Sequence, residues 1–300
     1  MNAFFCKYLE YLEGVKNFSL NTIEAYRKDL SIFESWIEET ELEFLKLTNF
    51  DVMTFVAEMS NRELSVSYIN RMLSTIRGFY KYAIKGKILE NNPTIGIKNL
   101  KMQQKIRPFL FPNEMKSLCK LPQETEVLWM ARDIALFSCL YSTGCRASEL
   151  LSLNMEDLDY ALSSAVVMGK GKKEREVFFT DFAKKALKNY FVEREALLKA
   201  RKKEIEKGDN PLFLNMRGGR LSVWGLNYII KRYLKFCPNI KKLSAHSFRH
   251  SFATALISRG ADIRVVQELL GHEDISTTQN YTHVTTEKLY ELYKKAHPHS

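Results

Sequence analysis

The chain has 300 residues, 45% of them hydrophobic and 27% charged, which is typical of a globular protein and is enough for two domains. It contains no apolar run of about 18 residues, so no membrane-spanning segment is expected. The five cysteines are widely spaced and form no CxxC pair, which argues against a disulfide framework or zinc knuckle and favours the reducing cytoplasm.

The net charge of +10 is unevenly distributed along the chain. Residues 1–105 hold 14 Lys and Arg against 13 Asp and Glu, whereas the rest hold 31 against 22. A basic surface attracts polyanions, nucleic acid first. Basic proteins with other functions are common, so charge alone leaves DNA binding open.

Residues 1–89 have the pattern of an all-helical domain. After Ser19, a plausible N-cap, apolar residues recur every three or four positions. A longer helix begins near Ser65 and carries several basic residues on its polar faces. The Asn-Asn-Pro at 91–93 ends this helix, because proline cannot continue it.

Residues 90–107 are predicted to be an interdomain linker. Its segment KNLKMQQKIR has four basic residues, no acidic one and little apolar content. A solvated linker is the simpler alternative. The missing acids slightly favour a linker that lies along a phosphate backbone.

Residues 108–300 combine helices with one predicted β-hairpin. Val166 and Val167 precede a turn built on Gly169 and Gly171, and a second apolar run follows at 177–179. The expected fold class is therefore mainly α with a small antiparallel β-sheet.

The segment LSAHSFRHSFATALISRG predicts a helix with two different faces. Phe248 and Phe252 anchor one face, and His246 and Arg249 project together from the opposite one. An arginine fork suits phosphate oxygens, and histidine adds a hydrogen bond or a proton. An exposed polar face without function is the alternative.

The next predicted helix leads towards the end of the chain. Ile263 and Val266 are expected to pack inward, and Gly271 ends the helix, so that His272 is the first residue beyond it. Tyr281 follows in polar sequence, nine residues after His272, where a tyrosine has no apolar neighbours to pack against.

Two further residues lie at turns. Arg146 stands where an apolar helix turns into the next, and needs an anionic partner, either Glu149 or a bound anion. Lys170 lies at the hairpin tip between glycines, which give the backbone freedom. An ordinary solvated lysine is the alternative for this position.

The order R…K…HxxR…H…Y resembles the tyrosine recombinase (phage-integrase) family. The stretches TGCRASELLSL, GKGKKERE, HSFRHSFAT and LLGHEDISTTQNYTHV are similar to the family's Xer branch. Cys145 and Phe248 depart from it, since leucine is usual at both positions. The resemblance implies a helical core-binding (SAM-like) domain at 1–89 and an α+β catalytic domain at 108–300.

The resemblance also implies the site residues. The catalytic set would be Arg146, Lys170, His246, Arg249, His272 and the nucleophile Tyr281. Glu149 would support Arg146. Neither a metal nor another cofactor is expected. The basic residues expected to contact DNA are Arg71, Arg77, Lys81, Lys101, Lys105, Lys172 and Lys173.

The implied partners are duplex DNA with inverted half-sites and a homo- or hetero-tetramer with a related recombinase, with a septal DNA translocase as an activator. A helix at 285–297 would dock on a neighbouring protomer, or pack within its own chain. The function expected is resolution of chromosome or plasmid dimers. A mobile-element integrase or transposase, a non-catalytic architectural protein and a type-IB-like topoisomerase are the alternatives.

Overall fold

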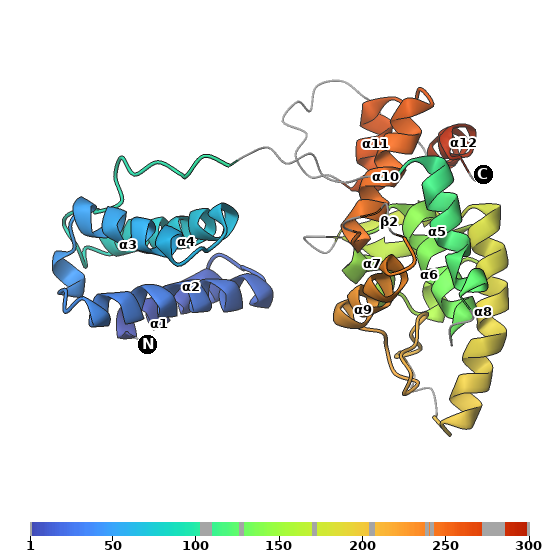
Figure 1. Ribbon diagram of the computed structural model, residues 1–300, viewed down its shortest axis with the longest axis horizontal. Coiled ribbons are helices and arrows are strands. Elements are labelled where there is room, and N and C mark those ends of the chain that lie inside the picture. The colour runs from blue at the N-terminus through green and yellow to red at the C-terminus, as the bar shows by residue number, and fades with distance from the viewer. Residues whose placement is uncertain are drawn as a thin grey trace. The chain divides into compact units, whose positions relative to one another are not determined.

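The computed structural model describes residues 2–102, 110–125, 129–169, 173–203, 208–237, 240, 243–271 and 286–298, with side chains from residue 289 in the last range. The chain divides into two compact units, Met1–Lys105 and Ile106–Ser300, each with its own hydrophobic core (Figure 1). None of the described helices is both long and apolar enough to cross a membrane.

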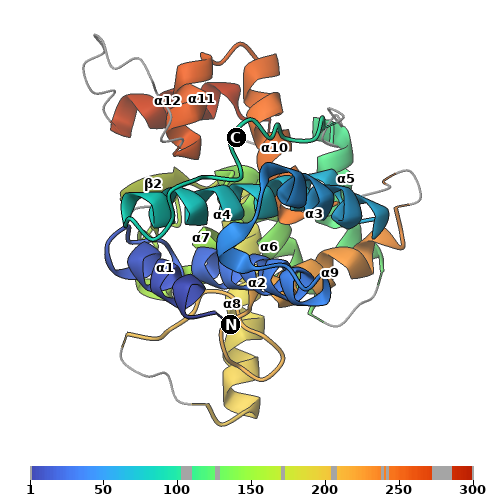
Figure 2. The ribbon, with the colours of Figure 1, turned by 90° about the vertical axis from the view of Figure 1, so that its left-hand side faces the viewer.

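The described part of unit 1 is helical. Its helices form two layers, α1 with α2 and α3 with α4 (Figures 1 and 2). Their bounds are Ala3–Gly14 for α1, Leu20–Glu39 for α2, Asn49–Asn61 for α3 and Val66–Lys85 for α4, with a 3-10 turn at Phe44–Lys46. Ser19 and Ser65 cap α2 and α4 as predicted, because each side chain accepts the N–H of a residue in the first turn.

The first part of the predicted linker is held against α4. The Asn70 side chain donates to the carbonyl of Leu100 at 2.9 Å and accepts the N–H of the same residue at 2.8 Å. Arg77 donates to Asn99 Oδ1 at 2.6 Å and to the carbonyl of Ile97. The chain up to Leu100 therefore packs as part of unit 1, while the limits of the linker stay a prediction.

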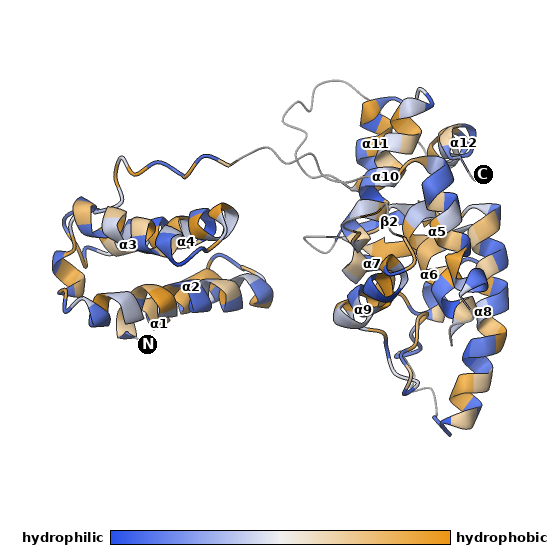
Figure 3. Ribbon diagram, viewed as in Figure 1, coloured by the Kyte–Doolittle hydropathy of each residue, from blue (hydrophilic) through white to orange (hydrophobic). Residues whose placement is uncertain are grey.

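Unit 2 is built around α6. Nearly all of α6 is buried, and it packs against α5, α8 and α10. Figure 3 shows the ribbon of α6 coloured mainly as hydrophobic residues, beside α8 with its mixture of hydrophobic and hydrophilic residues. The helices are α5 (Pro112–Glu124), α6 (Met130–Thr143), α7 (Ala147–Ser152), α8 (Asp181–Ala200), α9 (Val223–Leu234), α10 (Ala245–Ser258), α11 (Ile263–Leu270) and α12 (Thr286–Ala296), with a 3-10 turn at Met155–Asp157.

The predicted hairpin is present as β1 (Ser164–Met168) and β2 (Glu174–Phe178), which pair antiparallel. The fold class, mainly α with a small antiparallel sheet, is confirmed for the described residues. The prediction for Ile263 is wrong, because its side chain is 59% exposed. Burial on α11 is confined to Val266, Leu269 and Leu270, so Ile263, the first residue of this short helix, lies beyond the part that packs on the core.

The last helix, α12, packs within unit 2. Tyr293 is buried, and its hydroxyl donates to the carbonyl of Ser142 at 3.1 Å. The rings of Tyr290 and Tyr293 lie 5.0 and 5.6 Å from that of Phe178. The structure thus has the intramolecular arrangement, and docking on a neighbouring protomer stays a prediction about the assembled complex.

Candidate active site

Arg146 is placed by the sharp turn between α6 and α7. Gly144 ends α6 with φ +60°, and a Cβ there would lie 2.5 Å from the ring of Phe252. Only glycine combines this left-handed conformation with so little space. On the far side of the turn, Glu149 accepts the backbone N–H of Arg146 at 2.8 Å. Gly144 and Glu149 together set the position of the Arg146 backbone.

Glu149 is a buried carboxylate shared by two arginines. Its Oε1 accepts from Arg146 Nη1 at 2.6 Å, and its Oε2 accepts from Arg175 Nη2 at 2.8 Å. Burial acts to raise the pKa of Glu149, but the hydrogen bonds from Arg175 and Arg146 outweigh it and hold the pKa below its usual range. The predicted Arg146–Glu149 pair is present, and 41% of the Arg146 side chain remains exposed.

Arg249 lies on α10 and is only 5% exposed, so the alternative of an exposed polar face does not hold at this position. Its Nη1 donates to the carbonyl of Gly144 at 2.8 Å, and its Nη2 to that of Leu270 at 2.7 Å. Both carbonyls lie at the C-terminal end of a helix, α6 and α11 respectively, where a cation is stabilised. Burial, followed by the charge of Arg146, lowers the pKa of Arg249 to about 10, so the guanidinium stays charged at neutral pH.

His246 lies one turn before Arg249 and is exposed. The helix that carries it starts after Ser244, whose N–H donates to Ser247 Oγ at 3.2 Å. Phe248 and Phe252 are fully buried on the opposite face, as predicted. His246 and Arg249 therefore extend from the same rigid element.

Lys170, predicted at the hairpin tip, lies outside the described residues together with Lys172. The tip begins at Gly169, whose N–H donates to the carbonyl of Lys173 at 2.7 Å. This bond joins the two described residues that flank positions 170–172.

His272 and Tyr281 also lie outside the described residues. The structure describes the chain up to Gly271, which ends α11 in the left-handed conformation with φ +63°. Its N–H donates to the carbonyl of Glu268 at 2.9 Å. The described part of the chain thus brings Arg146, Glu149 and Arg249 together. It also fixes the position of Gly271, the residue before His272.

Arg175 is a site residue that the sequence analysis missed. It pairs with the buried Val167 across the hairpin, and its side chain is 14% exposed. Side chains two positions apart share a face of a strand. Arg175 is thus on the same face as the buried Val177. The alternation of residues along this strand is the sequence signal that could have indicated an inward-facing Arg175.

The seven predicted DNA contacts differ in their surroundings. Arg71 donates to the buried Asp29 at 2.8 Å, and Arg77 holds the chain at Ile97 and Asn99. Lys81, Lys101 and Lys173 have exposed side chains. Lys105 and Lys172 lie outside the described residues. The three exposed lysines are therefore the better candidates for phosphate contacts.

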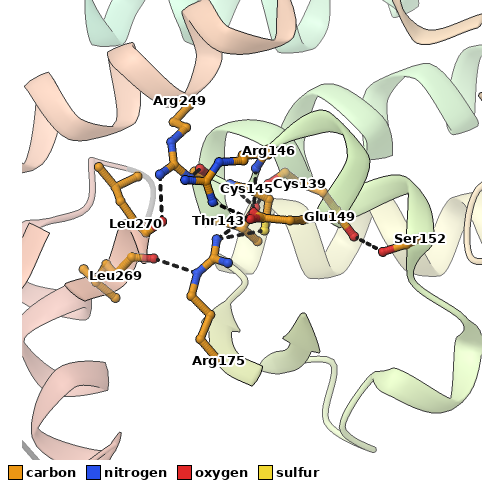
Figure 4. A network of polar contacts seen from close by, with 11 residues as sticks. Cys139, Thr143, Cys145, Arg146, Glu149, Ser152, Arg175, Arg249, Leu269 and Leu270 are labelled. Carbon is orange, nitrogen blue, oxygen red and sulfur yellow. Dashed lines mark hydrogen bonds and ion pairs between the residues drawn. The ribbon is translucent and has the colours of Figure 1, made fainter. Parts of the chain in front are cut away.

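The described part of the site carries a net positive charge. Figure 4 shows the guanidiniums of Arg146, Arg175 and Arg249 around the single carboxylate of Glu149. Three such groups with one carboxylate attract a second anion, and the partly exposed Arg146 can reach it. This arrangement is suited to holding a phosphate.

Comparison with known families covers most of the chain. Residues 5–87 match the profile of the phage integrase N-terminal SAM-like domain, and residues 108–288 match that of the phage integrase family.

Individual relatives extend over the full length. The chain is 50% identical to a tyrosine recombinase XerC of Treponema denticola over 100% of both chains. It is 38% identical to a tyrosine recombinase XerC of Oceanobacillus iheyensis, over 97% of this chain and 94% of that protein. Among solved structures, the XerH site-specific recombinase in a post-cleavage complex with a palindromic difH substrate has a TM-score of 0.72 and 21% identity, over 98% of this chain and 82% of that one. The Tn1549 transposon integrase in complex with circular intermediate DNA has a TM-score of 0.71 and 21% identity, over 95% of this chain and 97% of that one.

Proposed function

This chain belongs to the phage integrase family and is a tyrosine site-specific recombinase, and we propose that Tyr281 is its nucleophile, with Arg146, Lys170, His246, Arg249 and His272 as the other catalytic residues. The observation that carries this assignment is the cluster of three guanidiniums around Glu149, which comes from segments far apart in the chain. Its net charge fits a DNA phosphate.

The proposed reaction consists of two transesterifications. The Tyr281 hydroxyl attacks a DNA phosphate, forms a 3′-phosphotyrosyl bond and breaks the bond to the 5′-oxygen. His246 takes the phenolic proton, and Lys170 gives a proton to the departing 5′-oxygen. The 5′-hydroxyl of a partner strand then attacks the phosphotyrosyl bond and releases Tyr281. One ester replaces another at each step, so no ATP is consumed.

The arginines would stabilise the negative charge of the transition state. A pentacoordinate phosphate carries more negative charge than the diester, and Arg146 and Arg249 would bind its non-bridging oxygens, with hydrogen bonds from His246 and His272. A preorganised donor of this kind contributes about 3–4 kcal/mol to lowering the barrier. Arg249 suits this role because its two backbone bonds, to Gly144 and Leu270, fix the guanidinium before DNA arrives.

For the biological role, we infer resolution of chromosome or plasmid dimers at a dif-type site before cell division. Full-length similarity to proteins named XerC supports this role. The active form would be a homo- or hetero-tetramer on two DNA sites with inverted half-sites, activated by a septal DNA translocase, in the cytoplasm. Integration of a mobile element would use the same chemistry.

A nicked duplex tests the chemistry. The probe carries the dif-type inverted repeat of the chromosome that encodes this chain, with a nick that lets the cleaved end diffuse away. The wild-type chain should accumulate a covalent adduct that Tyr281→Phe does not form. Adduct formation by Tyr281→Phe would contradict the assignment. Salt-dependent binding without any adduct would indicate an architectural protein, and relaxation of a plasmid lacking the site by a lone monomer would indicate a topoisomerase.

A further inference from the structure

Arg175 contacts three segments that the proposed chemistry requires to be aligned. The first is the turn that carries Arg146. Arg175 Nη2 donates to Glu149 Oε2 at 2.8 Å, while the other oxygen of Glu149 holds Arg146. Arg175 and Arg146 are thus linked through the single carboxylate of Glu149.

The second segment is the end of α11. Arg175 Nε donates to the carbonyl of Leu269 at 3.3 Å. Its Cδ and Nε lie 3.0 and 3.2 Å from the position that a Cβ on Gly271 would occupy. Arg175 therefore packs directly on the last residue before His272, and the glycine leaves the space for it.

The third segment is the base of the hairpin tip. Arg175 Nη1 lies 3.9 Å from the position of a Cβ on Gly169, the residue before Lys170. This nitrogen is buried and has no hydrogen-bond partner among the described residues. The planar guanidinium thus lies between the hairpin base, Glu149 and the α11 terminus.

We propose that Arg175 is a positioning residue of this active site, which aligns the segments leading into Lys170 and His272 with the Glu149-supported Arg146. The inference rests on the proposed function, because it assigns Arg175 no contact with DNA and lets it act only through the catalytic groups. The rigid fork of arginine can hold two acceptors in fixed directions, whereas a lysine ammonium cannot reproduce that geometry. Arg175→Lys should therefore keep the charge and lose the alignment.

The test compares two leaving groups on the nicked duplex described above. One probe has the ordinary 5′-oxygen at the scissile phosphate, and the other has sulfur in its place. A thiol has a pKa of about 8.5, so a thiolate departs without the proton that an alkoxide requires from Lys170. Single-turnover rate constants for adduct formation are measured at saturating DNA. They come from time courses, so an inactive fraction of protein does not alter them.

With the oxygen probe, Arg175→Lys should slow adduct formation by about 100-fold, the cost of a small misalignment of catalytic groups, while DNA affinity changes by less than about threefold. With the sulfur probe the loss should shrink to less than about tenfold, because the Lys170 step is bypassed. Arg175→Gln should show the same pattern.

Arg194→Lys is the matched control. Arg194 is also an arginine of unit 2 with little exposed surface, and its bonds go to Pro211 and Asn210 instead of the site. It should leave both rate constants near those of the wild type. Unchanged rates in both Arg175 variants would overturn the inference. Equal losses on the two probes would overturn the alignment of Lys170 by Arg175. In either case a Tyr281-dependent adduct would uphold the proposed function. A wild-type chain that formed no adduct would remove both.

Discussion

Asn70 and Leu100 are joined by a reciprocal pair of hydrogen bonds, in which the side-chain amide of Asn70 engages both the N–H and the carbonyl of Leu100. The pair resembles the bonding of neighbouring strands, with a side chain in place of one backbone. It ties the chain that follows α4 to the N-terminal half of that helix. Leu100, although it lies within the predicted linker at 90–107, is thus held by unit 1.

Replacement of Asn70 should release this segment. Asn70→Ala removes both bonds and leaves the backbone groups of Leu100 to water, at a cost of about 1–3 kcal/mol. Trypsin should then cut faster after Lys98 and Lys101, which limited proteolysis followed by mass spectrometry would measure. Asn61→Ala, an exposed position at the end of α3, is the control. Equal cleavage rates in all three proteins would show that Asn70 does not restrain the segment.

Two glycines should respond in opposite ways to alanine. Gly144→Ala places a Cβ 2.5 Å from Phe252 in a left-handed turn, and should destabilise the chain by roughly 2–4 kcal/mol through strain and overpacking. Gly14→Ala has open space at the end of α1 and should be neutral or stabilise by up to about 1 kcal/mol. Urea unfolding measures both, and a Gly144→Ala chain as stable as Gly14→Ala would contradict the geometry of the turn.

Glu149 should contribute stability that depends on pH. Its pKa is lower in the folded state than the usual 4.5, so the ionised form stabilises the fold above that pH, and the contribution disappears as pH falls through the folded pKa. Glu149→Gln should therefore lower the free energy of unfolding by about 1–3 kcal/mol at neutral pH.

The difference in the free energy of unfolding between wild type and Glu149→Gln should then narrow as the pH falls through the folded-state pKa of Glu149. Denaturant titrations across a pH series give the comparison, and Glu195→Gln on the exposed surface of α8 provides the reference. A stability difference that persisted unchanged at acid pH would show that the charge of Glu149 is not what matters.

DNA affinity should distinguish Lys81 from Arg77. Each phosphate contact contributes about 0.9 to the slope of log affinity against log salt concentration. Lys81→Ala should reduce the slope by about that amount, because its exposed ammonium is a candidate phosphate ligand. Arg77→Ala should change the slope less, since its guanidinium is engaged by Asn99 and Ile97. Fluorescence anisotropy with labelled duplex at several salt concentrations tests this, and equal slopes for the two variants would refute it.

Removal of α12 should separate its two possible roles. A chain ending at Thr285 loses the buried Tyr293 and uncovers Phe178, so it should melt at a lower temperature. If protomers exchange α12, the truncation should in addition reduce the number of chains bound per DNA duplex, which sedimentation measures. Tyr293→Phe, which removes only the bond to Ser142, should cost about 1 kcal/mol and leave assembly intact. A truncated chain that assembled normally on DNA would exclude the exchange.

The sequence by itself determined the helices, the hairpin and the types of residue in the site. Helix starts at Ser19 and Ser65, the inward faces of the helices and the turn at Gly271 depend on residues a few positions apart, so their pattern is visible in the text of the chain. The six proposed catalytic residues indicated the family because each lies in a short motif that can be read locally, and the motifs follow in a fixed order: Arg146, Lys170, His246, Arg249, His272 and Tyr281.

Only the tertiary structure decided which groups support these residues. Arg175 meets Leu269 across 94 positions, and Arg249 meets Gly144 across 105. Neither pairing leaves a period in the sequence, because it depends on how α6, α10, α11 and the hairpin pack against one another. The burial of Arg249, the exposure of Ile263 and the tie between Asn70 and Leu100 have the same origin, since a side chain's surroundings are set by distant segments that local pattern does not encode.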